Sequence, residues 1–354
     1  METIRVALNA AAYDILIGNG LFQQAGCQLR RLTTAARAVV VSDETVAALY
    51  GQTLLEQMEA AGFAASMTVI PAGEASKSLA MLEKVYQGFA AARVSRGDLV
   101  VALGGGVVGD LTGFAAATYL RGVPYVQIPT TLLAQIDSSV GGKTAINLPQ
   151  GKNLAGAFYQ PAAVLIDPGL LDSLPQPTLR EGLAEALKYG AIADRGLFER
   201  IAACRSRDAF FRQAPALIAA CCRIKRDVVE EDEKDHGRRL HLNFGHSIGH
   251  AIEQVYNFQT YSHGEAVAIG MVKITEGSEQ RGFSRPGTAA AIREALAGLG
   301  LPVTTPDWDR EALLAAMALD KKNTGDKLRL IVLPQLGTAE IIAMSLEEAA
   351  AAFL

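Results

Sequence analysis

The sequence contains no uninterrupted apolar run of about 18 residues, the length that a membrane-spanning helix requires. A signal peptide is not expected either, because Glu2, Arg5 and Asp14 interrupt the N-terminal segment. Cysteine is scarce and forms no CxxC pair; the four residues stand at positions 27, 204, 221 and 222. We therefore expect buried thiols in a reducing cytoplasm, with neither a disulfide framework nor a zinc knuckle.

Basic residues are not in excess. The 33 lysines and arginines are outnumbered by 37 acidic residues, which gives a formal net charge of -4 and argues against a nucleic-acid partner. Half of the residues are hydrophobic and 20% are charged, a composition that indicates an ordered globular protein. The length of 354 residues is sufficient for two domains, each with its own core.

The first half alternates short apolar runs with helical patterns. Continuous apolar runs are typical of parallel strands buried on both faces. We predict an α/β, Rossmann-like parallel-sheet domain over residues 1–177 and a mostly α-helical domain over 178–354, with ligands at the carboxyl ends of the strands. The predicted strands are Ala38–Val41, Ser66–Ile70, Leu99–Leu103, Tyr125–Ile128 and Val164–Ile166.

Two capping boxes mark helix starts in the second half. Thr178–Glu181 predicts a helix that continues to about Ala191. Ser262–Glu265 predicts another, which Gly282 could end. Leu328–Leu333 is consistent with a late strand. Neither an internal repeat nor a low-complexity linker is visible, so we expect closely packed domains with the active site between them.

A glycine cluster follows one predicted strand directly. Asp98–Leu103 leads into Gly104–Asp110 and then into a helical pattern. Glycines at a strand-to-helix turn let the backbone approach a phosphate, although a tight turn packed on the sheet is the alternative. Glu74, which could accept from ribose hydroxyls, and Thr130–Thr131 also follow strands. Together these segments favour a dinucleotide site.

Histidine spacing predicts a divalent metal site. His246 and His250 are separated by one helical turn, and His263 begins the next helix. A catalytic zinc commonly takes two histidines and a glutamate, with an open position for substrate. Glu185 is the available carboxylate, since the glutamate one turn earlier has a capping role. Spacing leaves open whether His246 or His250 is the ligand, and whether Glu185 only pairs with Lys188 at the surface.

Cationic side chains cluster near these segments. Each lysine taken alone is more often solvated, but several lie beside glycine or asparagine in expected loops, where they could meet a phosphate or carboxylate. We therefore favour a polyanionic substrate over a simple alcohol. The cations are Lys143 and Lys152, which flank a Gly- and Asn-rich loop, with Lys188, Lys225, Arg239 and Lys321–Lys322.

Over nearly its whole length the sequence resembles the 3-dehydroquinate synthase family of sugar phosphate cyclases. The segments that carry the resemblance are Leu103–Leu111, Gln127–Ala145, Gly151–Ala162, Gly182–Ala191 and Leu242–Gln254. The resemblance implies NAD, one divalent metal (zinc or cobalt) and the metal ligands Glu185, His246 and His263. It selects His246 as ligand and places His250 near the substrate. One departure is Leu148, where many members have histidine.

The resemblance also implies residue roles. Arg121 matches a residue that the neighbouring subunit supplies, which implies a homodimer. Lys152 and His250 are the candidates for proton handling. The substrate contacts are Asp137, Asn153, Lys188, Lys225, Arg239, Asn243 and His250. The NAD contacts are Asp43, Glu74, Lys77, Gly105, Gly106, Val107, Val108, Gly109, Asp110, Thr130, Thr131, Lys143, Lys152, Leu170, Leu171, Asp172 and Ser173.

The implied reaction converts 3-deoxy-D-arabino-heptulosonate 7-phosphate (DAHP) to 3-dehydroquinate and phosphate in the shikimate pathway. It combines transient oxidation by NAD, phosphate elimination, reduction and an intramolecular aldol cyclisation. Two alternatives are a metal-dependent polyol or alcohol dehydrogenase and a cyclase of another sugar phosphate. An inactive scaffold would be expected to lack part of the metal set, which is complete here.

Overall fold

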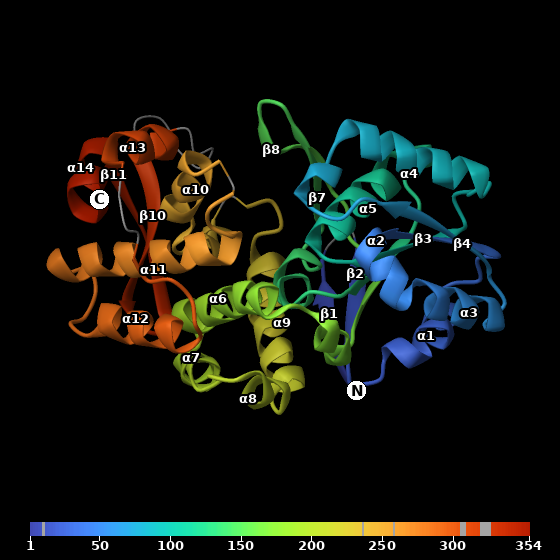
Figure 1. Cartoon of the computed structure of the whole chain (residues 1–354), viewed down its shortest axis with the longest axis horizontal. Helices are drawn as coiled ribbons and strands as arrows, with labels where there is room; N and C mark the ends of the chain where they lie inside the picture. Colours follow the sequence, from blue (N-terminus) through green and yellow to red (C-terminus); the bar gives the residue numbers. More distant parts are fainter. Residues whose placement is uncertain (9–10, 236, 258, 305–308, 319–326) are drawn as a thin grey trace. The chain divides into compact units, whose positions relative to one another are not determined.

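The structure is a computed structural model that describes all residues except 9–10, 236, 258, 305–308 and 319–326 (Figure 1). The lysine pair at 321–322 therefore lies outside the described residues. The chain divides into two compact units. The first comprises Met1–Pro175 and Lys225–Glu230, and the second comprises Gln176–Ile224 and Glu231–Leu354. Among the described residues, no helix is both long and apolar enough to cross a membrane.

The first unit contains a seven-stranded sheet with strand order β1-β2-β9-β6-β5-β3-β4. Every neighbouring pair is parallel except the β1–β2 hairpin. The five predicted strands are confirmed as β3, β4, β5, β6 and β9, whereas β1 and β2 were not predicted. The strands are β1 (Glu2–Ala7), β2 (Ala12–Ile17), β3 (Arg37–Asp43), β4 (Ala64–Ile70), β5 (Leu99–Gly104), β6 (Tyr125–Pro129) and β9 (Ala163–Ile166).

Helices cover both faces of this sheet, and alternate strand residues supply two cores. On one face Val40 packs in a cluster with Leu29 of α1 (Ala25–Leu32) and Leu54 of α3 (Gln52–Ala60). On the other face Val39 packs with Phe89 and Leu111, from α4 (Leu79–Ala91) and α5 (Gly106–Thr118). The shorter helical segments are η1 (Phe22–Gln24), α2 (Glu44–Val46), η2 (Ala47–Gly51), η3 (Glu74–Ser76), η4 (Tyr119–Arg121), η5 (Ala134–Ser138) and η6 (Pro168–Ser173).

The Gly- and Asn-rich segment flanked by Lys143 and Lys152 is not a loop, and this expectation was wrong. It forms an antiparallel hairpin of β7 (Lys143–Leu148) and β8 (Gly151–Phe158). In β7 Thr144 and Ile146 are buried while Lys143 is exposed, the alternation of a strand with one covered face. The period-two pattern determines the structure here and outweighs the turn-forming residues.

The second unit is mostly helical, and its described residues include one antiparallel pair of strands. The late strand is confirmed as β10, and β11 was not predicted. The elements are α6 (Gln176–Ala193), α7 (Arg195–Ala202), α8 (Arg207–Phe211), α9 (Ala214–Glu231), η7 (Arg238–Asn243), α10 (His246–Val255), α11 (His263–Gln280), α12 (Thr288–Gly298), α13 (Arg310–Ala318), β10 (Lys327–Gln335), β11 (Thr338–Ser345) and α14 (Leu346–Phe353). Six residues near the C-terminal end of α9, Lys225–Glu230, belong to the first unit.

One predicted capping box is confirmed and the other is wrong. Ser262 accepts from the Glu265 N–H while Glu265 accepts from the Ser262 N–H, and α11 ends before Gly282, which has φ +74°. The helix α6, in contrast, begins at Gln176, so Thr178 lies inside it and cannot cap it. Proline is tolerated in a first turn, which explains the earlier start. The cysteines are free thiols, but Cys27 is exposed and not buried as expected.

Candidate active site

Close backbone contacts bring helices α6, α10 and α11 together in the second unit. A Cβ on Gly264 would lie 2.4 Å from the Glu181 Cα, so only glycine lets the start of α11 lie against α6. A Cβ on Gly270 would lie 2.1 Å from the Gly245 carbonyl oxygen, next to the start of α10. These contacts determine how near the side chains at the starts of α10 and α11 come to α6.

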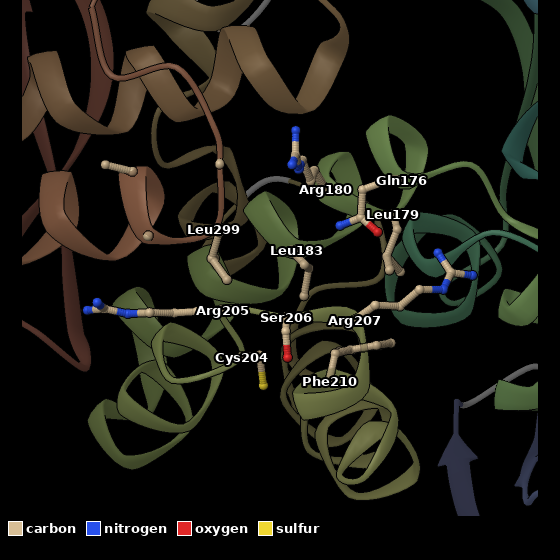
Figure 2. A pocket seen from close by; sticks show the side chains of 13 residues that line it. Gln176, Leu179, Arg180, Leu183, Cys204, Arg205, Ser206, Arg207, Phe210 and Leu299 are labelled. Atoms are coloured by element: carbon tan, nitrogen blue, oxygen red, sulfur yellow. The ribbon is translucent and has the colours of Figure 1, made fainter.

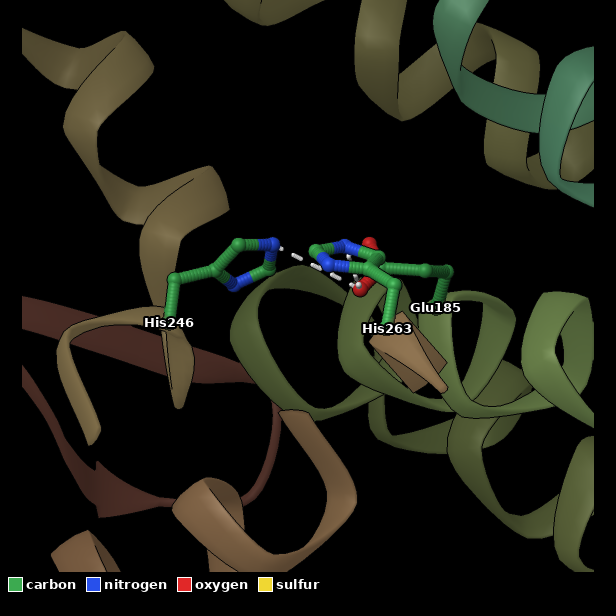
Figure 3. A group of neighbouring side chains, drawn as sticks. All are labelled: Glu185, His246 and His263. Carbon is green, nitrogen blue, oxygen red and sulfur yellow. Dashed lines mark ion pairs between the residues drawn. The ribbon is translucent and has the colours of Figure 1, made fainter. Parts of the chain in front are cut away.

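Glu185, His246 and His263 point toward one another from three different helices (Figure 3). The Oε1 atom of Glu185 lies 3.5 Å from His246 Nε2 and 3.8 Å from His263 Nε2. One ligand atom from each residue falls within 4.8 Å of the others. Oxygen and imidazole nitrogen in this combination are typical ligands of zinc and of similar divalent ions.

The hydrogen bonds of both rings direct Nε2 toward this cluster. His246 Nδ1 is 3.1 Å from the Phe244 carbonyl oxygen, and His263 Nδ1 is 3.2 Å from Glu253 Oε2. A backbone carbonyl and an ionised carboxylate only accept hydrogen bonds, so each Nδ1 carries the proton. Each Nε2 therefore presents a lone pair to a metal ion.

Glu185 and Lys188 form a buried ion pair, with relative exposures of 0% and 1%. The alternative of a surface pair is therefore wrong. Lys188 donates to Oε2, whereas Oε1 is buried without a hydrogen-bond partner among the described residues. Burial lowers the pKa of His263, but its hydrogen bond to Glu253 and the charge of Glu185 outweigh burial, and the pKa is raised.

His250 lies beside this cluster but is exposed. Its ring centroid is 5.3 Å from that of His246 and 6.1 Å from that of His263. His250, Glu253 and His263 form a second group whose ligand atoms fall within 4.8 Å of one another. In this second group Glu253 already accepts a hydrogen bond from His263. The group of Glu185, His246 and His263 therefore has more ligand atoms available for a metal ion.

In the first unit, the glycine cluster joins β5 to α5 as predicted. Gly105 precedes the first turn of α5, whose N–H groups have no acceptor within the helix. A Cβ on Gly105 would lie 3.0 Å from Thr131 Cγ2, and a Cβ on Gly106 would lie 3.0 Å from Ser138 Oγ. The backbone is thus open where side chains would fill the space, as a phosphate site requires. Val107, Val108 and Gly109 continue this turn, and the Thr130 hydroxyl is buried without a partner among the described residues.

A buried lysine joins three of the predicted residues. Lys77 Nζ donates to Asp110 Oδ2 at 2.7 Å and to Asn153 Oδ1 at 2.5 Å, and lies 3.9 Å from Glu74. Burial raises the pKa of Asp110 although Lys77 opposes the shift. Sequence reasoning missed Asn147, which donates to Glu74 Oε1 at 2.8 Å and accepts from the Asn153 N–H at 2.9 Å.

The predicted substrate residues fall into both units. Asp137 of η5 and Lys225 of α9 form an ion pair within the first unit, and Lys225 is buried. In the second unit, Arg239 is buried and donates to the Glu233 carbonyl oxygen at 2.6 Å. Asn243 ends η7, and two residues separate it from α10.

The remaining predicted residues do not all have side chains available to a ligand. Leu170 and Leu171 of η6 are buried, so they could contribute only backbone atoms, while Asp172 is exposed and Ser173 accepts from the Tyr50 hydroxyl at 2.7 Å. Asp43 caps α2 through the N–H groups of Thr45 and Val46. The others are exposed: Lys143 and Lys152 on the β7–β8 hairpin, and Arg121, which has φ +65° in η4.

A separate cavity of about 140 Å³ lies in the second unit (Figure 2). Leu179 and Leu183 of α6 line it together with Phe210 and Leu299, and Arg180, Arg205 and Arg207 lie around it. In Figure 2 the guanidinium groups of Arg205 and Arg207 point in different directions. None of the residues predicted for the site lines this cavity.

Comparison with known proteins identifies the family. The model of the 3-dehydroquinate synthase N-terminal domain matches residues 67–181, and that of the C-terminal domain matches residues 182–323. A 3-dehydroquinate synthase of Enterococcus faecalis is 46% identical over 345 residues, covering 98% of this chain and 96% of the relative. One from Clostridium kluyveri is 43% identical over 348 residues, covering 98% and 97%. The chain belongs to the 3-dehydroquinate synthase family.

Solved structures agree with this membership in the 3-dehydroquinate synthase family. The 2-epi-5-epi-valiolone synthase of Streptomyces hygroscopicus, with NAD+ and Zn2+ bound, has a TM-score of 0.88 and 30% identity, covering 98% of this chain and 97% of that one. A 2-deoxy-scyllo-inosose synthase has a TM-score of 0.89 at 23% identity, covering both chains completely, and supports the fold. The resemblance and the α/β class with a helical second part are confirmed.

Proposed function

We propose that the protein is a 3-dehydroquinate synthase, which converts DAHP to 3-dehydroquinate and phosphate. The observation that carries this proposal is 46% identity to such a synthase over nearly the full length of both chains, with the metal-binding residue types complete. In this reaction NAD would accept and later return one hydride, and a divalent ion would make a substrate hydroxyl more acidic. The following paragraphs assign what the residues of this chain contribute.

Glu185, His246 and His263 would hold the metal ion, either zinc or cobalt. The buried Glu185 Oε1 has no hydrogen-bond partner among the described residues, and this cost is removed if the oxygen binds a cation. Because each Nδ1 carries the ring proton, the Nε2 atoms of His246 and His263 both present lone pairs. Lys188 offsets the charge of Glu185, so the charge of a bound ion would remain available to substrate oxygens.

Residues 1–177 would bind NAD and residues 178–354 would bind the metal ion. The first turn of α5 offers N–H donors to the pyrophosphate, with Gly105 and Gly106 leaving room for it. Glu74 is exposed enough to accept from a ribose hydroxyl. Lys77 lies near both Glu74 and Asp110 and interacts with both carboxylates. The titratable groups of this network are therefore held in place before the cofactor binds.

Lysine and arginine side chains would bind the phosphate and carboxylate of the substrate. Lys225 is oriented by Asp137, and the buried Arg239 is oriented by a backbone carbonyl. Exposed Lys152 and His250 are the candidates for moving protons. We also propose a cytoplasmic homodimer, in which Arg121 completes the site of the neighbouring subunit.

The test is phosphate release from DAHP in the presence of a metal ion and substoichiometric NAD. We expect one phosphate per DAHP consumed and no net NADH. Steady accumulation of NADH with glycerol would instead identify a polyol dehydrogenase. Turnover of glucose 6-phosphate but not DAHP would identify another cyclase.

The metal assignment is tested with Glu185→Ala and His263→Ala. Both variants should lose bound metal and turnover while keeping their far-ultraviolet circular dichroism. Glu199→Ala is the matched control, because Glu199 is an exposed carboxylate in the same unit and pairs with the exposed Arg195. Full activity after exhaustive removal of metal would contradict the assignment.

A further inference from the structure

We infer that Glu253 is a positioning residue for the metal centre, acting through His263. It is buried, with a relative exposure of 5%, and was not among the residues predicted from the sequence. Its Oε2 atom lies 3.2 Å from His263 Nδ1. The inference rests on the proposed function, because it requires a metal ion at Glu185, His246 and His263.

The first step of the argument concerns the tautomer of His263. A neutral imidazole has one proton, which can reside on either ring nitrogen. Because a carboxylate only accepts, Glu253 stabilises the tautomer with the proton on Nδ1. The lone pair is then on Nε2, the atom that lies 3.8 Å from Glu185 Oε1. Without Glu253, some of the His263 rings would carry the proton on Nε2. These rings would have to change tautomer before Nε2 could bind a metal ion.

The second step concerns the orientation of the ring. His263 is the first residue of α11, so its side chain is not enclosed by a preceding helical turn. Glu253 lies in the last turns of α10, a helix that packs tightly on α11 through Gly249 and Gly270. The carboxylate is therefore held by a different helix and fixes the ring against rotation. A carboxylate that accepts from a ligating imidazole also makes its other nitrogen a stronger ligand.

The two histidines receive this support from different groups. His246 is oriented by the Phe244 carbonyl, a neutral backbone group that mutation cannot remove. His263 is oriented by a side chain, so its contribution can be tested by substitution. Glu253→Ala removes the acceptor, whereas Glu253→Gln keeps an amide oxygen that can still accept from Nδ1 but removes the charge.

The experiment measures the metal affinity of the full-length protein by competition with a chromogenic chelator. Loss of such a supporting group typically lowers metal affinity about 10- to 100-fold. We expect a loss in this range for Glu253→Ala and a clearly smaller loss for Glu253→Gln. Glu181→Gln is the matched control: Glu181 is a partly buried carboxylate near His263 that interacts with Ser262, and its substitution should change affinity less than Glu253→Ala.

A spectroscopic measurement separates positioning from a general structural role. The visible spectrum of the Co2+-loaded protein reports the ligand set, so Glu253→Ala should alter it while Glu253→Gln retains it. Unchanged affinity and spectrum in Glu253→Ala would overturn the inference. If the unsubstituted protein binds no metal at all, the proposed metal site fails instead, and the two failures are thereby distinguished.

Discussion

Lys188→Met should destabilise the metal-free protein strongly. Glu185 and Lys188 have relative exposures of 0% and 1%, so the substitution leaves a carboxylate in the interior without its cation. Removing one partner of such a buried pair costs about 3–5 kcal/mol. Protonation of His263, whose Nε2 lies 3.8 Å from Glu185 Oε1, would replace part of the lost charge, so the measurement is made well above its raised pKa.

A bound divalent ion should reverse much of this loss. The ion supplies positive charge to Glu185, so the metal-loaded variant is expected to lose less stability than the metal-free one. By linkage, the difference appears as tighter metal binding, about tenfold for each 1.4 kcal/mol. Glu185→Gln combined with Lys188→Met removes both charges and should recover most of the metal-free stability.

The assay is native-state hydrogen exchange of the amides in α6, with and without a chelator. Because the chain has two compact units, one global unfolding midpoint would not isolate the local effect, whereas exchange reports the opening free energy of the helix itself. Lys273→Met is the control, since Lys273 is a partly exposed lysine in the same unit and its pair with Glu276 should contribute at most about 1 kcal/mol. A metal-free loss below about 1 kcal/mol for Lys188→Met, or an equal loss with metal bound, would refute the reasoning.

Three further predictions follow from contacts in the two units. The pKa of His263 is raised, because its hydrogen bond to Glu253 and the charges of Glu185 and Glu253 together outweigh burial; the resulting stability of the metal-free protein should be fully present below the ordinary histidine pKa of about 6.5 and lost as pH rises through the raised value, as urea titrations across pH can check. Metal affinity should instead increase as pH rises through the pKa of His263, because ligation needs the neutral ring. Asn147→Ala should raise the KM for NAD by up to about 30-fold with little change in kcat, since it removes two hydrogen bonds worth about 1 kcal/mol each; an unchanged KM would contradict this. Gly264→Ala should destabilise α6 and α11 by about 1–3 kcal/mol in hydrogen exchange, because the added Cβ would lie 2.4 Å from the backbone of α6; a variant as stable as the parent would show that the helices can separate freely.

Much of the sheet could be predicted because its strands carry their signal locally. Val39, Val40 and their neighbours form a continuous apolar run, and the structure buries both faces of it. The β1–β2 hairpin has an equally local but weaker signal, since Ile4 and Val6 are buried while Arg5 is exposed. Two short strands with this alternation at the edge of a sheet resemble a loop in sequence. The β7–β8 hairpin is a separate two-stranded sheet, and there the glycine and asparagine residues suggested a loop.

The helix boundary at α6 was misjudged because a capping box is only a local pattern. Thr178 and Glu181 have the right spacing, but the helix begins two residues earlier at Gln176. This boundary also affects the predicted metal site, because the capping role assigned to Glu181 is the reason for choosing Glu185 as the ligand. In the structure burial raises the pKa of Glu181, and His263 and Ser262 interact with it. The choice of Glu185 nevertheless agrees with the geometry, because Glu185 Oε1 lies 3.5 Å from His246 Nε2 and 3.8 Å from His263 Nε2.

Residues that support the site could not be found from spacing at all. Glu253 is three residues after His250, so a helical pattern pairs these two on one face. Its partner is His263, ten residues away and on the next helix, and this pairing exists only because glycines let α10 and α11 approach closely. Asn147 likewise joins Glu74 to Asn153 across a hairpin whose existence was not predicted. Ligand types and helical spacing therefore predict a metal site and its candidate ligands, with the choice between His246 and His250 left open, while the groups that would orient those ligands become visible only after the tertiary contacts are known.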